Sequence, residues 1–386
     1  MGSRSRLWPN ARLFLRTIRV RPFELFFDLV FVFGITQVVV VLEHHLSWGG
    51  VGQAILVFWL LWWAWTQFTW ALNAADTEHP WIEFGTLVAT AVAFFMAVAV
   101  PEAFAGGALW FALPYVAVRV IGLTIYIGVM RENPEGRTVV QSFATASLFG
   151  LAAVIVGALL GGEYQAMLWV LVIILDMVAA TAAGKGDWAI HPEHFAERHG
   201  LIVIIALGES LIVAASGLVG AERSVDLLAA GFLAVSITCA LWWSYFPVAK
   251  PALERSLSHA SGVKQATMAR DAFSLAHFPM LCGVIAYAVA IEAAVAHPSD
   301  PLGTEARVAL ALGLLLFMGG LAVAYWRASC EVKTSRVVVS VVTALGVFLL
   351  ADVTAVVSLG VAFAGVAVVA FLEERQAERL VVRDLG

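Results

Sequence analysis

The chain has 386 residues, of which 61% are hydrophobic and 13% are charged, and its mean hydropathy is +0.89. Because a soluble domain carries about a quarter charged residues, this composition excludes an ordinary soluble protein. The formal net charge of −5 identifies no partner by itself, and the three cysteines lack the paired spacing of a disulfide framework or a zinc knuckle.

Long apolar runs follow one another along the chain, each close to the roughly 20 residues that cross a bilayer. We therefore predict an all-α polytopic membrane protein with about twelve transmembrane helices in contact with the lipid bilayer. Ten or eleven spans are the alternatives, because residues 336–372 contain only Asp352 as an interior charge. The predicted spans are 23–42, 51–73, 83–104, 108–130, 138–160, 165–183, 199–219, 226–248, 272–296, 306–326, 335–353 and 356–372.

The first predicted span begins with two carboxylates in an otherwise apolar and aromatic stretch. Pro22 suits the first turn of a helix, and Glu24 and Asp28 then share one helical face. Ionisable groups within a spanning helix are costly and tend to be functional. The alternative for Glu24 is an ion pair with Arg19 or Arg21, or an interaction with the helix N-terminus. For Asp28, one turn deeper, we expect a place in a functional site or a polar core.

Spans 2 to 6 add an aromatic face and a buried basic residue. The tryptophan-rich face of span 2 predicts either a constriction or packing and interfacial anchoring, which large aromatic residues more commonly provide. Arg119 lies deep in span 4 and therefore needs a carboxylate partner. We also predict Asp176, in span 6, as a member of the polar core. The acids available to Arg119 are Glu24, Asp28, Glu102, Asp176, Glu209 and Glu292.

Further ionisable residues precede and occupy span 7. Residues 191–199 hold three histidines and two glutamates, and His194 and Glu197 could share a helical face, which suits a metal or a pH sensor. The alternative is a solvated lead-in to the span, and no metal ligands are assigned because the spacing fits no specific metal motif. Glu209 lies near the middle of span 7, where an acid costs about 3 kcal/mol on insertion scales. It is predicted to bind an ion or a proton, and the alternative is a buried carboxyl group that joins helices.

The order of motifs in the first half of the chain recurs in the second half. Acids open spans 1 and 7, aromatic clusters occupy spans 2 and 8, and acids end spans 3 and 9. Six spans per half would enter the membrane in the same direction, which describes a parallel repeat. The predicted organisation is an N-terminal tail (1–22), a first six-helix repeat (23–183), a connector (184–198), a second six-helix repeat (199–372) and a C-terminal tail (373–386).

Aligning the two halves of the chain adds neutral side chains to the predicted site. Counted from the acids that open spans 1 and 7, Thr36 occupies the position of Glu209. Thr36 and Gln37 in span 1 would therefore complement Glu209 and Ser210 in span 7. With Glu24, Asp28, Arg119, Asp176 and Glu197, these residues form the predicted pathway or polar core.

The distribution of basic residues predicts the orientation of the chain. Twenty of the 23 lysines and arginines fall in the tails and on the side of the connections that the tails share. Arg223 and Arg307 fall on the other side, and Arg119 lies inside a span. We therefore predict that both termini, the connector and the two tails are cytoplasmic.

Several classes of function lack support in the sequence. There is no glycine-rich phosphate loop, no nucleophile elbow and no basic, aromatic surface for nucleic acid. We therefore expect no catalytic residues, no cofactor, no metal and no nucleic-acid partner, and we expect that the protein is not an enzyme. An oligomer is compatible with the sequence.

Two motifs resemble the bacterial low temperature requirement protein A family. They are Phe23-Glu-Leu-Phe-Phe-Asp-Leu-Val-Phe-Val32 and His194-Phe-Ala-Glu-Arg-His-Gly-Leu-Ile-Val-Ile-Ile-Ala-Leu-Gly-Glu-Ser210. The resemblance covers roughly residues 20 to 372. It implies a polytopic protein of the bacterial inner membrane that is linked to growth in the cold, and it implies no settled molecular activity.

Residues 26–36 are also similar to the Phe-Ser-Asp helix of two-repeat potassium channels. Those channels have six spans per repeat and cytoplasmic termini, and their first helices line the pore. Here Phe27 replaces the serine, and Gly200 and Leu201 stand where a second such motif would begin. The resemblance therefore suggests a pathway between the first helices without carrying over a cation selectivity.

Three functional hypotheses follow. The first is a channel or secondary transporter for a small ion or solute, with Asp28 and Glu209 on the pathway and Glu24 and Glu197 at its cytoplasmic mouth. The second is an intramembrane sensor or structural protein whose acids and Arg119 form a rigid polar core. The third is a lipid-modifying enzyme that would use the histidine-rich loop.

Overall fold

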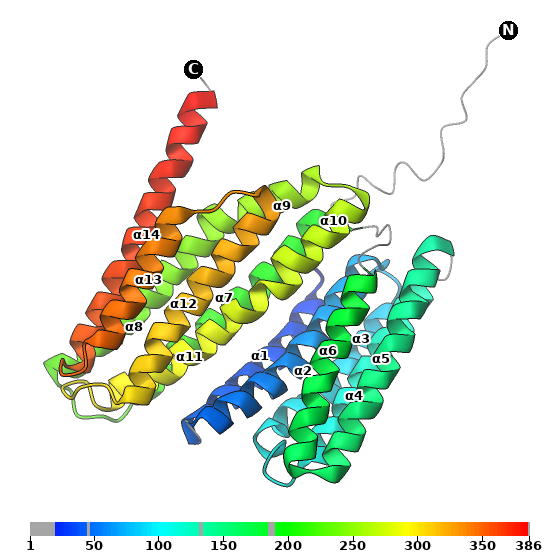
Figure 1. Ribbon diagram of the computed structural model, residues 1–386, viewed down its shortest axis with the longest axis horizontal. Coiled ribbons are helices and arrows are strands. Elements are labelled where there is room, and N and C mark those ends of the chain that lie inside the picture. The colour runs from blue at the N-terminus through cyan, green and yellow to red at the C-terminus, as the bar shows by residue number, and fades with distance from the viewer. Residues whose placement is uncertain (1–19, 45–46, 131–133, 184–189, 385–386) are drawn as a thin grey trace.

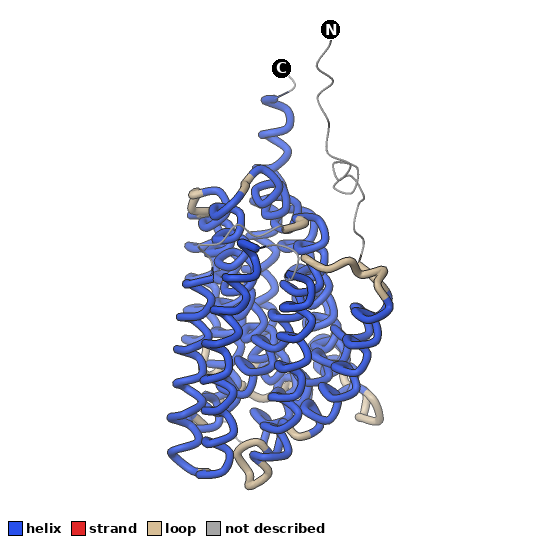
Figure 2. Tube along the Cα trace, turned by 90° about the vertical axis from the view of Figure 1, so that its right-hand side faces the viewer, coloured by secondary structure: helices blue, strands red, loops and turns tan. Residues whose placement is uncertain are grey.

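The computed structural model describes residues 20–44, 47–130, 134–183 and 190–384. Within these ranges the regular structure is helical, and the β-type pairing is one isolated bridge between Pro301 and Thr354. Figure 2 shows the helices packed as one elongated bundle.

The first half of the chain contains six long helices and one short 3₁₀ helix. These are α1 (Pro22–His44), α2 (Trp48–Asn73), α3 (Pro80–Val98), the 3₁₀ helix η2 (Val100–Glu102), α4 (Ala108–Val129), α5 (Pro134–Leu160) and α6 (Gly162–Ala183). The second half contains eight α-helices and two π-helical segments. These are α7 (Pro192–Leu218), α8 (Val225–Trp243), π-helix η4 (Ser244–Ala249), α9 (Lys250–His259), α10 (Gly262–Met268), π-helix η5 (Ala269–Leu275), α11 (His277–Ala296), α12 (Thr304–Ser329), α13 (Thr334–Leu349) and α14 (Ala355–Asp384).

Eleven helical segments of the described chain are long and apolar enough to cross a membrane. The continuous helices formed by α8 to α9 and by α10 to α11 each count as one segment. The remaining apolar helix, α13, has 16 residues and is shorter than a full span. The prediction of an all-α polytopic membrane protein is confirmed.

The helix ends follow from local sequence signals. Pro22, Pro80 and Pro192 stand at the first position of α1, α3 and α7, where a missing N–H costs no hydrogen bond. The Oγ of Ser47 accepts a hydrogen bond from the backbone N–H of Gly50 at 3.1 Å, which caps α2. These signals fix where the helices enter the bundle.

The helices form two groups that meet along one interface. Figure 1 shows α1 to α6 gathered on one side and α7 to α14 on the other. In the first group α1 packs on α2 and α3, α3 on α4, α4 on α5, and α5 on α6. In the second group α7 packs on α8 and α11, α11 on α12, α12 on α13, and α13 on α14. This parallel order is compatible with the predicted duplication, which remains a prediction.

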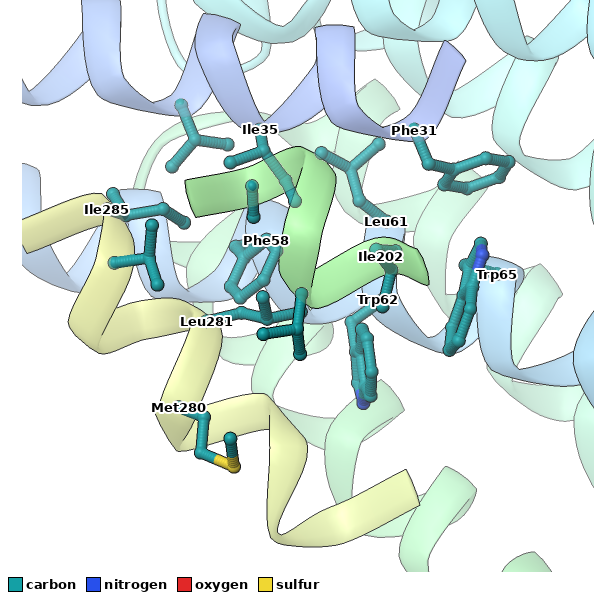
Figure 3. Packing of buried hydrophobic residues seen from close by; sticks show 14 of the residues in the cluster. Phe31, Ile35, Phe58, Leu61, Trp62, Trp65, Ile202, Met280, Leu281 and Ile285 are labelled. Carbon is teal, nitrogen blue, oxygen red and sulfur yellow. The ribbon is translucent and has the colours of Figure 1, made fainter. Parts of the chain in front are cut away.

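The interface between the two groups is built from large apolar side chains of α1, α2, α7 and α11. Figure 3 shows Ile35 of α1, Leu61 of α2, Ile202 of α7 and Leu281 of α11 pointing toward one another. Ile35, Leu61 and Ile202 are at most 2% exposed, and Leu281 is fully buried. Continuous apolar packing therefore joins the two halves at mid-depth.

The boundary difference that bears most on the site lies at α7. We predicted span 7 from residue 199 and a connector over 184–198, but α7 begins at Pro192. Pro192 provides a helix start, and a polar first turn can continue into an apolar helix when its charged side chains find buried partners. Similarly, residues predicted as the C-terminal tail from 373 onward continue α14 as far as Asp384. Residues 184–189, in the predicted connector, lie outside the described residues.

Candidate functional site

Four ionisable side chains meet where α1 and α7 pack together. Glu24 and Asp28 occupy the first two turns of α1, and His194 and Arg198 occupy the first two turns of α7. Each pair is separated by four residues, so each helix presents both of its side chains on one face. All four side chains are 0% exposed. We call these four residues the α1–α7 charge cluster.

Ion pairs connect the two helices within the cluster. Arg198 forms a short contact with Oδ1 of Asp28, and its Nη1 lies 3.2 Å from Oε2 of Glu24. His194 Nε2 lies 3.1 Å from Oε2 and 3.3 Å from Oε1 of Glu24. Glu24 also accepts a hydrogen bond from the backbone N–H of Arg21 at 3.2 Å, which ties it to the start of α1.

Two residues of α2 fix the orientation of the cluster. Trp65 Nε1 donates a hydrogen bond of 2.7 Å to Oδ1 of Asp28. The side-chain oxygen of Asn73 accepts a hydrogen bond from the backbone N–H of His191 at 2.9 Å, so its Nδ2 is the donor toward Nδ1 of His194 at 3.1 Å. Nδ1 of His194 is therefore an acceptor, and Nε2 carries the hydrogen that is donated to Glu24. This tautomer leaves the His194 ring neutral.

The cluster thus contains two carboxyl groups and one guanidinium group. Next to it, burial lowers the pKa of His191, so the His191 ring adds no positive charge at neutral pH. If Glu24 and Asp28 are both ionised, one negative charge is not compensated by a neighbouring cation. An uncompensated charge in a membrane interior is costly, so the cluster is suited to bind one proton or one small cation.

Three polar atoms of the cluster lack a hydrogen-bond partner within the described part of the chain. They are Oδ2 of Asp28 and two nitrogens of Arg198, Nε and Nη1, of which Nη1 still lies in the ion pair with Glu24. Each unsatisfied buried polar group costs about 1–3 kcal/mol. The free oxygen of Asp28 is the atom of this cluster that can accept a proton or coordinate a cation without displacing an existing contact.

Neutral polar side chains continue from the cluster toward α11. His199 lies one residue after Arg198, and its Nδ1 donates to the carbonyl oxygen of Phe195 at 2.9 Å. Within the described residues its Nε2 has no partner, although its ring centroid lies 5.2 Å from that of His277. His277 in turn contacts the hydroxyl group of Tyr245 at 2.8 Å. The polar core therefore reaches from α1 across α7 to η4 and α11.

A second buried ion pair lies within the first half. Nη2 of Arg119 lies 3.5 Å from Oδ1 of Asp176, and Nη1 donates to the hydroxyl group of Tyr115 at 2.8 Å. Ser147 at 3.3 Å accepts from the same guanidinium group, and Trp59 Nε1 donates to Asp176 at 3.4 Å. Asp176 is one of the six acids that the sequence offered to Arg119, and the pair contains one positive and one negative group.

A third buried ion pair lies within the second half. Nε of Arg336 donates to Oε1 of Glu373 at 2.6 Å, and both side chains are at most 3% exposed. The sequence had placed Arg336 at the boundary of span 11 and Glu373 in the C-terminal tail. This pair is also balanced, with one cation and one anion.

The remaining predicted residues lie farther along α1 and α7. Thr36 is half-buried and donates to the carbonyl oxygen of Val32 at 3.3 Å, while Gln37 is half-buried one residue later. Ser210 is buried and donates to the carbonyl oxygen of Leu207 at 2.7 Å. The structure does not bring these side chains into the α1–α7 charge cluster.

Glu197 and Glu209 also lie outside the cluster. Both are half-buried on α7, and no hydrogen bond to either is found among the described residues. Glu209 stands eleven residues beyond Arg198, about 16 Å along the helix. The pathway role of Glu209 therefore stays a prediction, separate from the site at Asp28. No group of three or more metal-binding side chains is found in the part of the chain that the structure describes.

A cleft of about 470 Å³ opens on the same interface at the end opposite the charge cluster. It is bounded by the last turns of α1, the first turns of α2, the middle turns of α11 and the N-terminal half of α12. The interface between the halves is therefore sealed by ion pairs toward one end and hollow toward the other.

The sequence did not identify Arg198, Trp65 or Asn73 as site residues. Arg198 was counted among the basic residues of a connection, although Pro192 signals a helix that would bury it two turns later. Once α7 begins there, His194 and Arg198 share a face in the same way as Glu24 and Asp28. The roles of Trp65 and Asn73 depend on how α2 packs against α1 and α7, for which the sequence holds no local signal.

Comparison with known proteins agrees with this architecture. Residues 19–371 match the family described as bacterial low temperature requirement A protein. A relative from Rhizobium meliloti (strain 1021), named as an uncharacterised protein, is 33% identical and aligns over 77% of this chain and 75% of its own length. No solved structure matches the chain at a significant level. The chain belongs to the bacterial low temperature requirement A protein family.

Proposed function

We propose that this protein is a channel or secondary transporter for a small ion or solute, with its pathway between the first helices of the two halves. In this proposal the α1–α7 charge cluster binds one proton or small cation during each transport event. Asp28 is the binding carboxylate, and Arg198 is the cation paired with it when no proton or other cation is bound.

The observation that carries the proposal is the charge imbalance of this cluster. The ion pairs Arg119–Asp176 and Arg336–Glu373 each match one cation with one anion, as a structural pair requires. The α1–α7 charge cluster instead has two carboxyl groups for one guanidinium group. An intramembrane acid without its own counter-ion is expected where a protein binds and releases ions.

The shape of the interface also supports transport. The ion pairs of the cluster join α1 to α7 at the end where both helices begin, while the cleft opens between the same two halves at the other end. Transporters built from two halves expose a central site to one side at a time. We propose that this structure represents the state that is open at the cleft, with the α1–α7 charge cluster as the closed gate.

The other predicted residues take secondary roles in the proposal. Thr36, Gln37, Glu209 and Ser210 line a continuation of the pathway between α1 and α7, and Glu197 lies near its entrance. Both termini are cytoplasmic, in the inner membrane of a bacterium, as the basic residues of the tails and connections suggest. The predicted parallel duplication is part of the same proposal.

Reconstitution in proteoliposomes tests this proposal. Vesicles that contain a pH-sensitive dye would be exposed in turn to gradients of protons, alkali and alkaline-earth cations, and halides, and flux would be recorded against protein-free vesicles. We expect flux above background for at least one ion, and its loss in Asp28→Asn. The matched control Glu222→Gln removes a carboxylate from the exposed connection between α7 and α8 and should keep the flux. Background flux for the whole panel, or equal flux in Asp28→Asn, would contradict the proposal.

The complete burial of the cluster favours a second candidate, an intramembrane sensor or structural protein. In that case the ion pairs only lock α1 onto α7, and the excess carboxyl group is permanently protonated. Asp28→Asn would then preserve growth in the cold and the folded state together, with no ion flux in the wild type. The flux panel separates the two candidates.

A further inference from the structure

The cleft at the end opposite the charge cluster has the form of a small-molecule site. Its volume of about 470 Å³ lies within the roughly 300–1,000 Å³ that such sites occupy. Ile55 and Phe58 of α2, Ile285 of α11 and Leu316 of α12 are among the apolar side chains that form its walls. Phe58 and Leu316 lie close to the middle of their helices, so the cleft reaches the middle of the bundle.

Polar and aromatic groups gather at the mouth of the cleft. Ser47, Trp48, Thr304 and Glu305 line it there. Trp48 is 81% exposed, so its ring is available to a ligand that enters. The one arginine close to the mouth in sequence, Arg307, points elsewhere and donates to the carbonyl oxygens of Leu302 and Ala351.

Two further carboxyl groups stand beside this mouth. Glu43 follows the lining residue Leu42 on α1, and Glu292 lies one turn after the lining residue Val289 on α11. The carboxyl groups of Glu43 and Glu292 interact with each other, which brings α1 and α11 together next to the cleft. Glu305 is thus the acid that lines the chamber, with this pair of carboxyl groups beside it, and no lysine or arginine is among the described residues that line it.

We propose that this cleft binds an amphipathic organic cation, such as an amine or phosphonium compound with a bulky apolar body. The apolar walls suit the body of the ligand. The ring of Trp48 and the carboxylate of Glu305 suit its positive charge, because cations are attracted both to indole faces and to carboxylates. An anionic amphiphile of the same shape is disfavoured by the carboxylate of Glu305, and no lysine or arginine among the described lining residues would attract it.

This inference does not depend on the transport proposal, because it concerns binding to the purified protein. If the cation binds but no flux is detected in proteoliposomes, the cleft is a ligand site and the transport proposal fails alone. If flux is detected but the cation does not bind, the cleft inference fails alone.

Tetraphenylphosphonium and tetraphenylborate provide the test, since they share size and shape but carry opposite charges. Binding of each ion to the full-length protein in detergent would be measured by equilibrium dialysis, with protein-free micelles subtracted. We expect saturable binding of tetraphenylphosphonium and no saturable binding of tetraphenylborate. Equal binding of both ions would show a non-selective apolar groove, such as one occupied by lipid chains, and would overturn the proposal.

Variants locate the site. Glu305→Gln should weaken tetraphenylphosphonium binding about two- to fivefold, because an exposed charge–charge contact is being removed. Leu312→Trp, which adds volume at a half-exposed lining position, should weaken it about tenfold or more. The control Glu222→Gln removes the same charge from the connection between α7 and α8 and should bind as the wild type does. Unchanged binding in both Glu305→Gln and Leu312→Trp would overturn the assignment to this cleft.

Discussion

Asp28 is the residue on which the charge of the α1–α7 charge cluster depends. Its Oδ1 accepts hydrogen bonds from Trp65 and Arg198, while its Oδ2 has no partner among the described residues. Glu24, one turn earlier, is satisfied by His194 and by the start of its own helix. The two carboxyl groups on one helical face therefore differ in what they can still bind.

This difference predicts losses of stability of different size for two substitutions. Arg198→Gln leaves two buried carboxyl groups without their cation and should destabilise the protein by about 3–5 kcal/mol. Asp28→Asn keeps an acceptor for Trp65 and balances the cluster, so its cost should stay below about 1.5 kcal/mol. Thermal unfolding of the purified proteins in detergent measures both. Equal destabilisation by the two substitutions would contradict the excess of one carboxyl group over the guanidinium group in the cluster.

The double variant Asp28→Asn/Arg198→Gln extends this comparison. Because it removes one charge of each sign, it should unfold at a higher temperature than Arg198→Gln alone. Additive losses in the double variant would show that the two side chains do not interact in the folded protein.

The ion pair Arg119–Asp176 in the first half, with one cation and one anion, can be compared with the α1–α7 charge cluster. Replacing Arg119 by Met together with Asp176 by Leu exchanges a buried ion pair for apolar groups of similar size, which is often neutral or stabilising by about 1–4 kcal/mol. We expect this double variant to fold and to keep any flux of the wild type. Loss of flux in a stable Arg119→Met/Asp176→Leu protein would show that the pathway includes this pair.

At the level of elements, α11 and α12 make the closest helix contact seen around the cleft. A Cβ atom added at Gly283 would lie 2.5 Å from the carbonyl oxygen of Gly313 and 2.6 Å from the backbone nitrogen of Phe317. The two backbones touch because glycine occupies both sides, as in other close crossings of membrane helices. This contact holds the wall of the cleft that α11 and α12 form.

A methyl group added at Gly283 should therefore push α11 and α12 apart. Gly283→Ala is expected to lower stability by about 1–3 kcal/mol through overpacking against backbone atoms, which cannot rotate away. Gly319→Ala on α12, where an added Cβ meets no atom within 4 Å, is the matched control and should not be destabilising. Melting temperature and monodispersity in detergent provide the measurement. A stable Gly283→Ala protein would contradict the close packing.

The elements themselves were largely predictable from the sequence, because apolar runs of spanning length dominate it. The two acids of α1 were also recognised, since an ionisable residue stands out in an apolar helix. Arg198 was missed because charge at the edge of an apolar run resembles a solvated connection, and its burial depends on carboxyl groups 170 residues away. The partnership of Glu373 with Arg336 was missed for the same reason. Which charged side chains pair in the folded protein cannot be predicted from a local sequence pattern.

On the scale of the whole molecule, the two halves contact each other in two different ways. Toward the end where α1 and α7 begin, the contact is ionic and fully buried. In the middle it is apolar, through residues such as Ile35 and Ile202 (Figure 3). Toward the other end it gives way to the cleft. A rocking motion about the apolar middle would open one end as it closes the other.

The central claim is that the two halves rock against each other, so that one end of their interface opens as the other closes. Side-specific labelling of a cysteine in the cleft tests this claim most directly. Ile55→Cys, on the cleft wall, would be introduced into a protein whose three natural cysteines are replaced by alanine, and its reaction with a membrane-impermeant maleimide would be followed in vesicles of known orientation. We predict rapid labelling from the side opposite the termini. The neutral triple variant Glu24→Gln/Asp28→Asn/Arg198→Gln removes the ionic gate without leaving a buried charge, so it should slow this labelling several-fold. The same labelling rate with and without the three substitutions would contradict the account.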